Sequence, residues 1–226
     1  MKKRLLSLIM AVMMVVVLVV PAAAATTDTT SDGTVTVYVT YGMFTEGGYD
    51  TAKKAPAKQA YNSDAAPTSD KINSNFYINA YTLSINTIKT DYMETTQYAY
   101  GVPDTSVSYF KTPNLVDAIL AAFVEKDIDI TDPNVVSAGW DDHPVRGNPG
   151  GYINYVAPQY PVYNETIKET RDGVLYNVYS GEGWNIACGT SASNIKALDA
   201  YGTSTALEDG MIIVFDFSPY LIYDVL

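Results

Sequence analysis

The sequence has little of what catalytic centres and nucleic-acid interfaces usually require. It contains one cysteine, Cys188, one histidine, His143, and only 14 Lys and Arg residues in 226. A single cysteine cannot form an intramolecular disulfide, and one cysteine with one histidine cannot complete a four-ligand zinc site. Charged residues make up 17% of the chain, against about 25% in a typical domain. We therefore expect packing alone to hold the fold.

Basic residues are not only few but also scattered beyond the first positions of the chain. The 25 Asp and Glu residues give a net charge of -11 and an isoelectric point of about 4.4. Proteins that bind phosphate backbones do so with clustered Lys and Arg, so we expect no nucleic-acid partner. The same acidity disfavours attachment to an anionic membrane surface.

The residues also lack the patterns of common enzymes, and we expect no catalytic activity. No Gly-x-Ser-x-Gly motif accompanies His143, and no glycine-rich phosphate loop links a strand to a helix. A nucleophilic Cys188 would need a histidine, so a buried apolar role is the plainer interpretation of this residue. We expect no metal site, with one weak alternative left open. This is calcium at Asp141 and Asp142, which lack EF-hand spacing and are more typical of solvated turn charges.

The first 25 residues have the pattern of a secretory signal peptide. Three basic residues at 2–4 precede an apolar run at 5–20, and alanines at 22–25 provide a small-residue cleavage site. The run is shorter than the about 20 residues that cross a bilayer, so an uncleaved anchor is the minor alternative. We expect a secreted, extracellular chain without a membrane span after cleavage. Its net charge would be -14, and residues 26–33 would form a flexible leader.

Alternation of apolar and polar residues predicts several β-strands. Residues 34–40 place Val35, Val37 and Val39 on one face, which is the period-two pattern of a half-buried strand. The Asp209–Gly210 pair favours a tight turn before the last predicted strand. Further strands are expected at 76–85, 97–100, 107–111, 152–156, 174–179, 183–189 and 211–217.

Between these strands the sequence predicts one clear helix and two irregular segments. Thr112 is the expected cap of the helix, which carries an apolar stripe and should end near Lys126. Residues 41–71 look like a surface excursion with a short helix at 51–61. Residues 139–151 are so rich in Gly, Pro and Asp that we expect a turn-rich loop.

Four motifs occur in a characteristic order along the chain. They are T-x-x-L-V-D-A-I-L at 112–120, Gly-Gly-Tyr at 150–152, a Gly-Trp strand ending in Gly at 183–189, and L-x-D-G-M-I-I at 207–213. In this order they resemble the transcobalamin-C-terminal-like domain of secreted Gram-positive bacterial proteins, a domain of unknown function.

The resemblance implies an α+β fold in which a β-grasp-like mixed sheet packs on one main helix. It implies a single domain over residues 34–226, with a β-rich insertion at about 41–106. The namesake domain of animal transcobalamin and intrinsic factor forms part of a cobalamin cavity. A cobalamin-like ligand is therefore the cofactor that the resemblance suggests, although folds of this kind have many functions.

Two non-catalytic functions follow as hypotheses. The first is an extracellular binding module for a corrinoid-like or other flat hydrophobic small molecule. Its candidate residues are aromatic or polar: Trp184, Asn185, Tyr152, Trp140 and His143, the last of which could approach a metal in the ligand.

The second hypothesis is a cell-surface adhesion or assembly module that binds a protein or glycan. The sheet edge, the tyrosine-rich insertion and the loop at 139–151 would form its surface. The plainer interpretation of Trp184 is a core anchor over the helix, whereas Trp140 is expected to be exposed or half-exposed in its loop.

Overall fold

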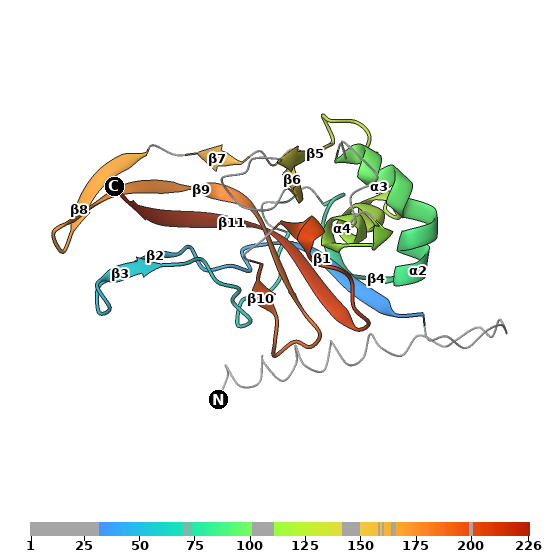
Figure 1. Cartoon of the computed structure of the whole chain (residues 1–226), viewed down its shortest axis with the longest axis horizontal. Helices are drawn as coiled ribbons and strands as arrows, with labels where there is room; N and C mark the ends of the chain where they lie inside the picture. The colour runs from blue at the N-terminus through green and yellow to red at the C-terminus, as the bar shows by residue number, and fades with distance from the viewer. Residues whose placement is uncertain are drawn as a thin grey trace. The chain divides into compact units, whose positions relative to one another are not determined.

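The computed structural model describes residues 32–69, 72, 74–100, 111–141, 150–157, 159, 161–163, 166–198 and 201–226, which belong to one compact unit, Asp32–Leu226 (Figure 1). The expected signal peptide, nearly all of the leader and most of the strand expected at 107–111 lie outside these residues. Asp142 and His143 lie outside them as well. Within the described residues, no helix has the length and apolar character needed to span a membrane.

A mixed sheet forms the centre of this α+β fold (Figure 1). It has seven strands, with the order β10-β9-β11-β1-β4, and β7 and β8 also pair with β9. β1 runs parallel to β11 and antiparallel to β4, while β9 runs antiparallel to β11. The strands of this sheet are β1 (Thr34–Tyr41), β4 (Ile78–Ser84), β7 (Val162–Tyr163), β8 (Ile167–Arg171), β9 (Val174–Gly189), β10 (Lys196–Ala197) and β11 (Met211–Val225).

Two short strand pairs lie outside the main sheet, and helical segments connect several strands. The pairs are β2 (Gly48–Asp50) with β3 (Ala55–Ala57), and β5 (Val136–Asp141) with β6 (Gly150–Val156). The helical segments are α2 (Ile85–Thr87), the π-helical η1 (Ile88–Tyr92), α3 (Met93–Ala99), α4 (Leu115–Val124) and the 3₁₀ turn η4 (Gly202–Ser204).

The strands predicted at 34–40, 152–156 and 211–217 are confirmed. The two strands predicted at 174–179 and 183–189 are parts of the single strand β9. The turn predicted before β11 is also present, since Gly210 has a φ of 75°. The Gly210 N–H donates to the Thr34 carbonyl at 2.8 Å, which ties the start of β11 to the start of β1.

Alternation along the central strands gives the sheet two different buried faces. On one face Val37, Ile213 and Phe215 belong to a core that includes nearly all of α4. On the other face Val214 packs with Met43 and neighbouring residues of the excursion that follows β1. The sheet is therefore covered on both sides where β1 and β11 run together.

The predicted helix exists as α4, but its cap is Asn114 and not Thr112. The Asn114 side chain accepts hydrogen bonds from the N–H groups of Val116 and Asp117. The Asp117 carboxylate in turn accepts from the Asn114 N–H at 3.1 Å, which completes a capping box. The expected one-sided stripe is wrong as well, because every residue from 115 to 123 is buried.

The strand predicted at 97–100 is wrong, since these residues end α3. Thr96 and Tyr100 are four residues apart, so helical spacing places them on one face. Both hydroxyls donate to Asp117 Oδ1, at 2.6 Å and 3.1 Å respectively. A helix is therefore required for both side chains to reach one buried carboxylate of α4.

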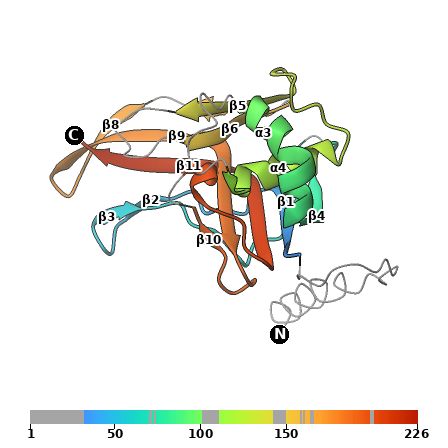
Figure 2. The same cartoon turned by 45° about the vertical axis from the view of Figure 1, so that its right-hand side comes forward.

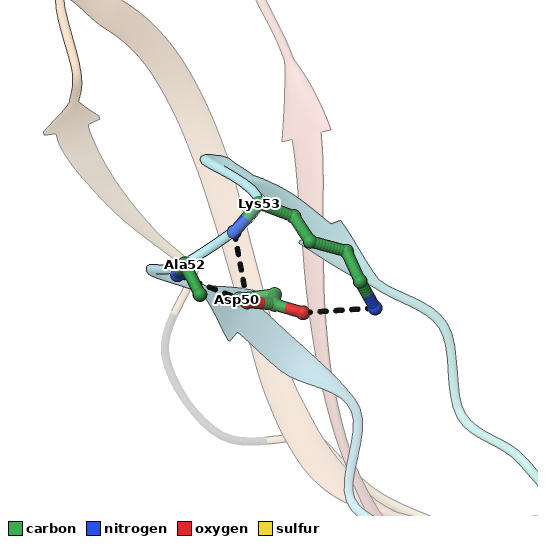
Figure 3. Close-up of polar contacts among 3 residues, drawn as sticks. All are labelled: Asp50, Ala52 and Lys53. Atoms are coloured by element: carbon green, nitrogen blue, oxygen red, sulfur yellow. Dashed lines mark hydrogen bonds and ion pairs between the residues drawn. The ribbon is translucent and has the colours of Figure 1, made fainter.

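The short helix predicted at 51–61 is replaced by a turn and β3 (Figure 3). The Asp50 carboxylate accepts from the N–H groups of Ala52 and Lys53, both at 3.0 Å, and pairs with Lys53 Nζ at 3.0 Å. Lys54 then adopts a φ of 52°, which a helix does not permit. The turn-rich loop expected at 139–151 is also corrected, because its ends lie in the paired strands β5 and β6.

The positive φ of Gly210 predicts a measurable cost of adding a side chain there. No atom lies within 4 Å of a Cβ built at this position, so Gly210→Ala introduces backbone strain alone. We expect a loss of about 1 kcal/mol in the free energy of unfolding, measured by urea denaturation. Gly183→Ala is the control, because its Cβ would meet Tyr220 at an ordinary 3.5 Å and no positive φ is involved. Equal losses in both variants would contradict the strain assignment.

Candidate interaction surface

β9 and β11 extend beyond the core and form a three-stranded arm with β8, which comprises residues 166–182 and 219–226. Figures 1 and 2 show these three strands continuing away from α3 and α4. Pairing of β11 with β9 is continuous through the arm and ends at Val225 opposite Tyr176. β8 pairs on the other side of β9, with Glu169 also opposite Tyr176.

One face of the arm, the covered face, is closed by a cluster of tyrosines. Tyr176 of β9 and Tyr223 of β11 are buried, and Tyr49 of β2 packs on both with ring centroids 5.8 Å and 5.6 Å away. The Tyr49 hydroxyl donates to Asp172 at 2.7 Å, and the Tyr223 hydroxyl donates to Glu169 at 2.9 Å. No local sequence pattern predicts this cluster, because its members are far apart in the chain.

The excursion after β1 reaches this covered face by passing along the edge of β11. The Gly42 N–H donates to the Phe217 carbonyl at 3.1 Å, and the Leu221 N–H donates to the Glu46 carbonyl at 2.6 Å. Between these positions the Pro219 carbonyl accepts from the Gln59 side chain at 2.9 Å. A proline is tolerated here because its nitrogen faces the edge and not the β9 ladder.

The opposite face of the arm, the open face, is formed by side chains that alternate with the covered ones. Its apolar members are largely solvent-exposed: Leu175 is 43% exposed, Ile222 45% and Leu226 56%. The Leu226 N–H donates to the Leu175 carbonyl at 3.0 Å, so strand geometry continues to this residue. The open face comprises Lys168 and Thr170 of β8, Leu175, Asn177 and Tyr179 of β9, Ile222 and Asp224 of β11, and Leu226.

Exposed apolar side chains concentrate on the arm and the strand beside it. In the part of the chain that the structure describes, ten large hydrophobic residues are exposed, and eight of them lie on β7, β8, β9 and β11 or directly after β11. The other two, Tyr98 and Tyr152, lie on α3 and β6. Single exposed apolar residues are ordinary, but a contiguous group marks an interaction surface.

The charged groups of the arm also differ between its faces. On the covered face Arg171 forms an ion pair with Glu169 at 2.6 Å, and at the β8–β9 turn Asp172 lies 3.7 Å from the Lys54 ammonium. On the open face Lys168 and Asp224 have no ion-pair partner among the described residues. The free charges of the arm are therefore on the same face as the exposed Leu175, Ile222 and Leu226.

Trp184, the main candidate ligand residue from the sequence, is a half-buried part of the core. Its ring stacks on Phe215 with centroids 4.4 Å apart and an interplanar angle of 12°, and it also contacts Phe217. This placement agrees with its interpretation as a core anchor. The indole Nε1 is buried and has no hydrogen-bond partner among the described residues. Asn185 follows on the opposite face of β9 and donates to the Gly183 carbonyl at 3.1 Å.

Two further candidate ligand residues, Trp140 and Tyr152, lie in the β5–β6 pair. Trp140 is half-buried against the core, as one of the two expected placements has it, but it lies in β5 opposite Gly151 and not in a loop. Tyr152 of β6 is 38% exposed, and its ring lies 6.3 Å from that of Tyr201. Since Gly151 and Tyr152 are consecutive in a strand, Trp140 and Tyr152 point to opposite faces. Asp141 ends β5.

Cys188 has a structural role in the core. Cys188 is half-buried against the core, and burial raises the pKa of its thiol, which disfavours the reactive thiolate. His143 and Asp142, the latter of the calcium alternative, lie outside the described residues. Among the described residues, no three His, Cys, Asp or Glu side chains gather as a metal site would require.

The buried Asp117 carboxyl predicts a specific pH dependence of stability. Burial raises its pKa from 3.8 to about 6, although hydrogen bonds from Thr96, Asn114 and Tyr100 oppose the shift. An acid with a raised folded-state pKa contributes stability below its unfolded pKa and loses it as the pH rises through the folded value. We expect wild type to lose about 2.5 kcal/mol relative to Asp117→Asn between pH 4 and 8.

Denaturation of both proteins across this pH range measures the difference. Asp64→Asn is the control, because Asp64 is exposed and its carboxylate is not part of a buried network. Its stability should follow the wild-type pH profile. Parallel profiles for wild type and Asp117→Asn would show that Asp117 does not titrate in this way.

Comparisons with known proteins do not assign the chain to a family. No family model, curated protein or solved structure matches it. The surface of the arm is therefore the feature on which a functional proposal rests.

Proposed function

We propose that this chain is a secreted, non-catalytic interaction module that binds another protein through the open face of its arm. The observation that carries the proposal is the set of exposed apolar side chains on one sheet face outside the core, Leu175, Ile222 and Leu226. The signal-peptide pattern of the first 25 residues supports secretion. Partner binding would remove the exposed side chains from water, which stabilises the complex by about 25 cal/mol per Å² of apolar area buried.

The open face departs from the usual pattern of a sheet with one buried side. In such a sheet, side chains on the solvent side are normally polar. β8 follows this rule, with Lys168 and Thr170 on the open face. β9 and β11 do not, because their open-face positions include Leu175, Tyr179 and Ile222. Next to these residues in the chain, Tyr176, Val178 and Tyr223 are buried on the covered face. A second layer against these strands would restore the two-sided burial that their sequences favour.

We also propose that the fold is of the β-grasp type implied by the sequence resemblance. In support, β1 and β11 are parallel and central, β4 and β9 flank them, and α4 packs against one face. On this proposal the arm is an extension of the last two strands. The predicted insertion then contains β2 and β3, which cover the arm, as well as β4 and the helices that follow it.

Site-directed photocrosslinking tests the proposed function. A photoreactive amino acid at Ile222, on the open face, should give a covalent protein adduct when the producing cells secrete the chain and are illuminated. The same group at Tyr98, which is 77% exposed on α3, is the matched control and should give none. The masses of tryptic fragments would identify the partner. No adduct at Ile222, or equal adducts at both positions, would contradict the proposal.

A site for a flat hydrophobic ligand at Trp184 is the second candidate function. The observation that favours it is the buried indole N–H without a partner, since buried donors are nearly always hydrogen-bonded. The stacked contact with Phe215 weighs against it, because one face of the indole is already occupied.

Titration with cobalamin and cobinamide separates the two candidates. Tryptophan emission of the purified protein should remain unchanged if the arm is the functional surface. A ligand site at Trp184 would instead give quenching, and this would disappear in Trp184→Phe while persisting in Trp140→Phe. Because these are the only two tryptophans of the chain, each variant reports on the other residue.

A further inference from the structure

We propose that the partner bound at the open face is a second copy of this chain, packed face to face about a twofold axis parallel to β9. This inference rests on the proposed function and names its partner. It is based on the positions of two opposite charges in the register of the arm.

Three polar side chains form one row across the open face. Lys168 of β8 and Asp224 of β11 both lie opposite Asn177 of β9, one on each side. The row therefore carries a positive charge at one edge, an amide in the middle and a negative charge at the other edge. Lys168 and Asp224 are two strands apart, about 10 Å, so Asn177 separates them within one chain.

Apolar side chains flank this polar row on both sides. Tyr179 and Ile222 are directly opposite each other across β9 and β11, and Leu175 and Leu226 are joined by a main-chain hydrogen bond on the other side of the row. The face thus has an apolar strip, a charged row and a second apolar strip along the strands. Such a pattern fixes the position of a partner along the strands as well as across them.

A twofold axis parallel to β9 makes this pattern complementary to itself. The rotation exchanges the β8 side with the β11 side, so Lys168 of one copy faces Asp224 of the other, and this occurs twice. It keeps each row at the same height, so Leu175, Asn177 and Tyr179 of β9 each face their own copy. Ile222 and Leu226 of β11 face the β8 side of the other copy, where Thr170 lies opposite Leu175. Packed sheets lie about 10 Å apart with nearly aligned strands, a separation that a lysine and an aspartate side chain can bridge together.

The other in-plane twofold axis, perpendicular to the strands, is disfavoured by the same residues. It would place Lys168 against its own copy and Asp224 against its own copy, and like charges at such an interface are repulsive. The net charge of -14 that the secreted chain would carry already opposes association of two copies. The two complementary pairs therefore select one orientation, while Leu175 and Tyr179, each facing its own copy, supply the central apolar contact.

The patch is smaller than a standard interface, so the dimer should be weak. Stable interfaces bury about 800 Å² on each partner, and a three-stranded patch offers less. We expect a dissociation constant in the micromolar range, with association weakened by salt because exposed ion pairs are screened.

Charge exchange between the two positions tests the inference. Sedimentation equilibrium of the purified protein should show a monomer–dimer equilibrium. Lys168→Asp alone and Asp224→Lys alone should each raise the dissociation constant about tenfold, because each places like charges together twice. The double variant Lys168→Asp with Asp224→Lys should restore the wild-type value to within about threefold. Lys196→Asp is the control for net charge, since Lys196 is exposed on β10 away from the arm, and it should have little effect.

The outcomes separate this inference from the proposed function. A purified protein that remains monomeric, or a double variant no better than the single ones, would overturn the self-association. If photocrosslinking at Ile222 then captures a different protein, the proposed function stands and only the identity of the partner was wrong. If it captures nothing, the proposed function fails as well.

Discussion

The unbroken pairing of β9 with β11 is the constraint on which both the core and the arm depend. Its register runs without a bulge from Ile212 opposite Gly189 to Val225 opposite Tyr176. Because side chains alternate with a period of two, one register fixes every position along both strands. The same alternation that turns Phe215 toward α4 turns Tyr223 toward Tyr49. A slip of one residue would exchange the buried and exposed sets in the core and the arm together.

The excursion after β1 determines which face of this long ribbon stays uncovered. In the core it covers the face opposite α4, where Met43 and Phe44 pack beside Val214. It is anchored there by Asp216, a buried carboxylate that accepts from the Thr40 hydroxyl at 2.7 Å and from the Met43 N–H at 2.9 Å. It then follows the edge of β11 and covers the other face of the arm through Tyr49. The open face stays uncovered because the excursion crosses from one face of the β9–β11 ribbon in the core to the other face in the arm.

Sequence patterns were sufficient where a local period or a turn determines the structure. The alternation of residues 34–40, the apolar run before Asp216 and the Asp209–Gly210 turn all appear as expected. Sequence patterns failed where a contact with a residue far along the chain determines the local structure. Thr96 and Tyr100 form a helix because both reach Asp117, a contact that local alternation cannot show. The tyrosine cluster of the arm joins three distant segments for the same reason.

The tryptophan that the sequence motif contains lies on the core side of the same ribbon. Aromatic type made Trp184 attractive as a ligand residue, but its even position in β9 turns it toward the core face together with Phe215. The odd positions of β9 point the other way, where Ala187 is covered by the excursion and Leu175 is not. The odd or even position of a residue in the strand determines the face on which its side chain lies. Only the path of the excursion shows whether that face is exposed to solvent. Exposure on this ribbon therefore depends on the whole fold. Leu175 and Ile222 are part of the open face of the arm, whereas the tryptophan of the Gly-Trp motif packs against the core.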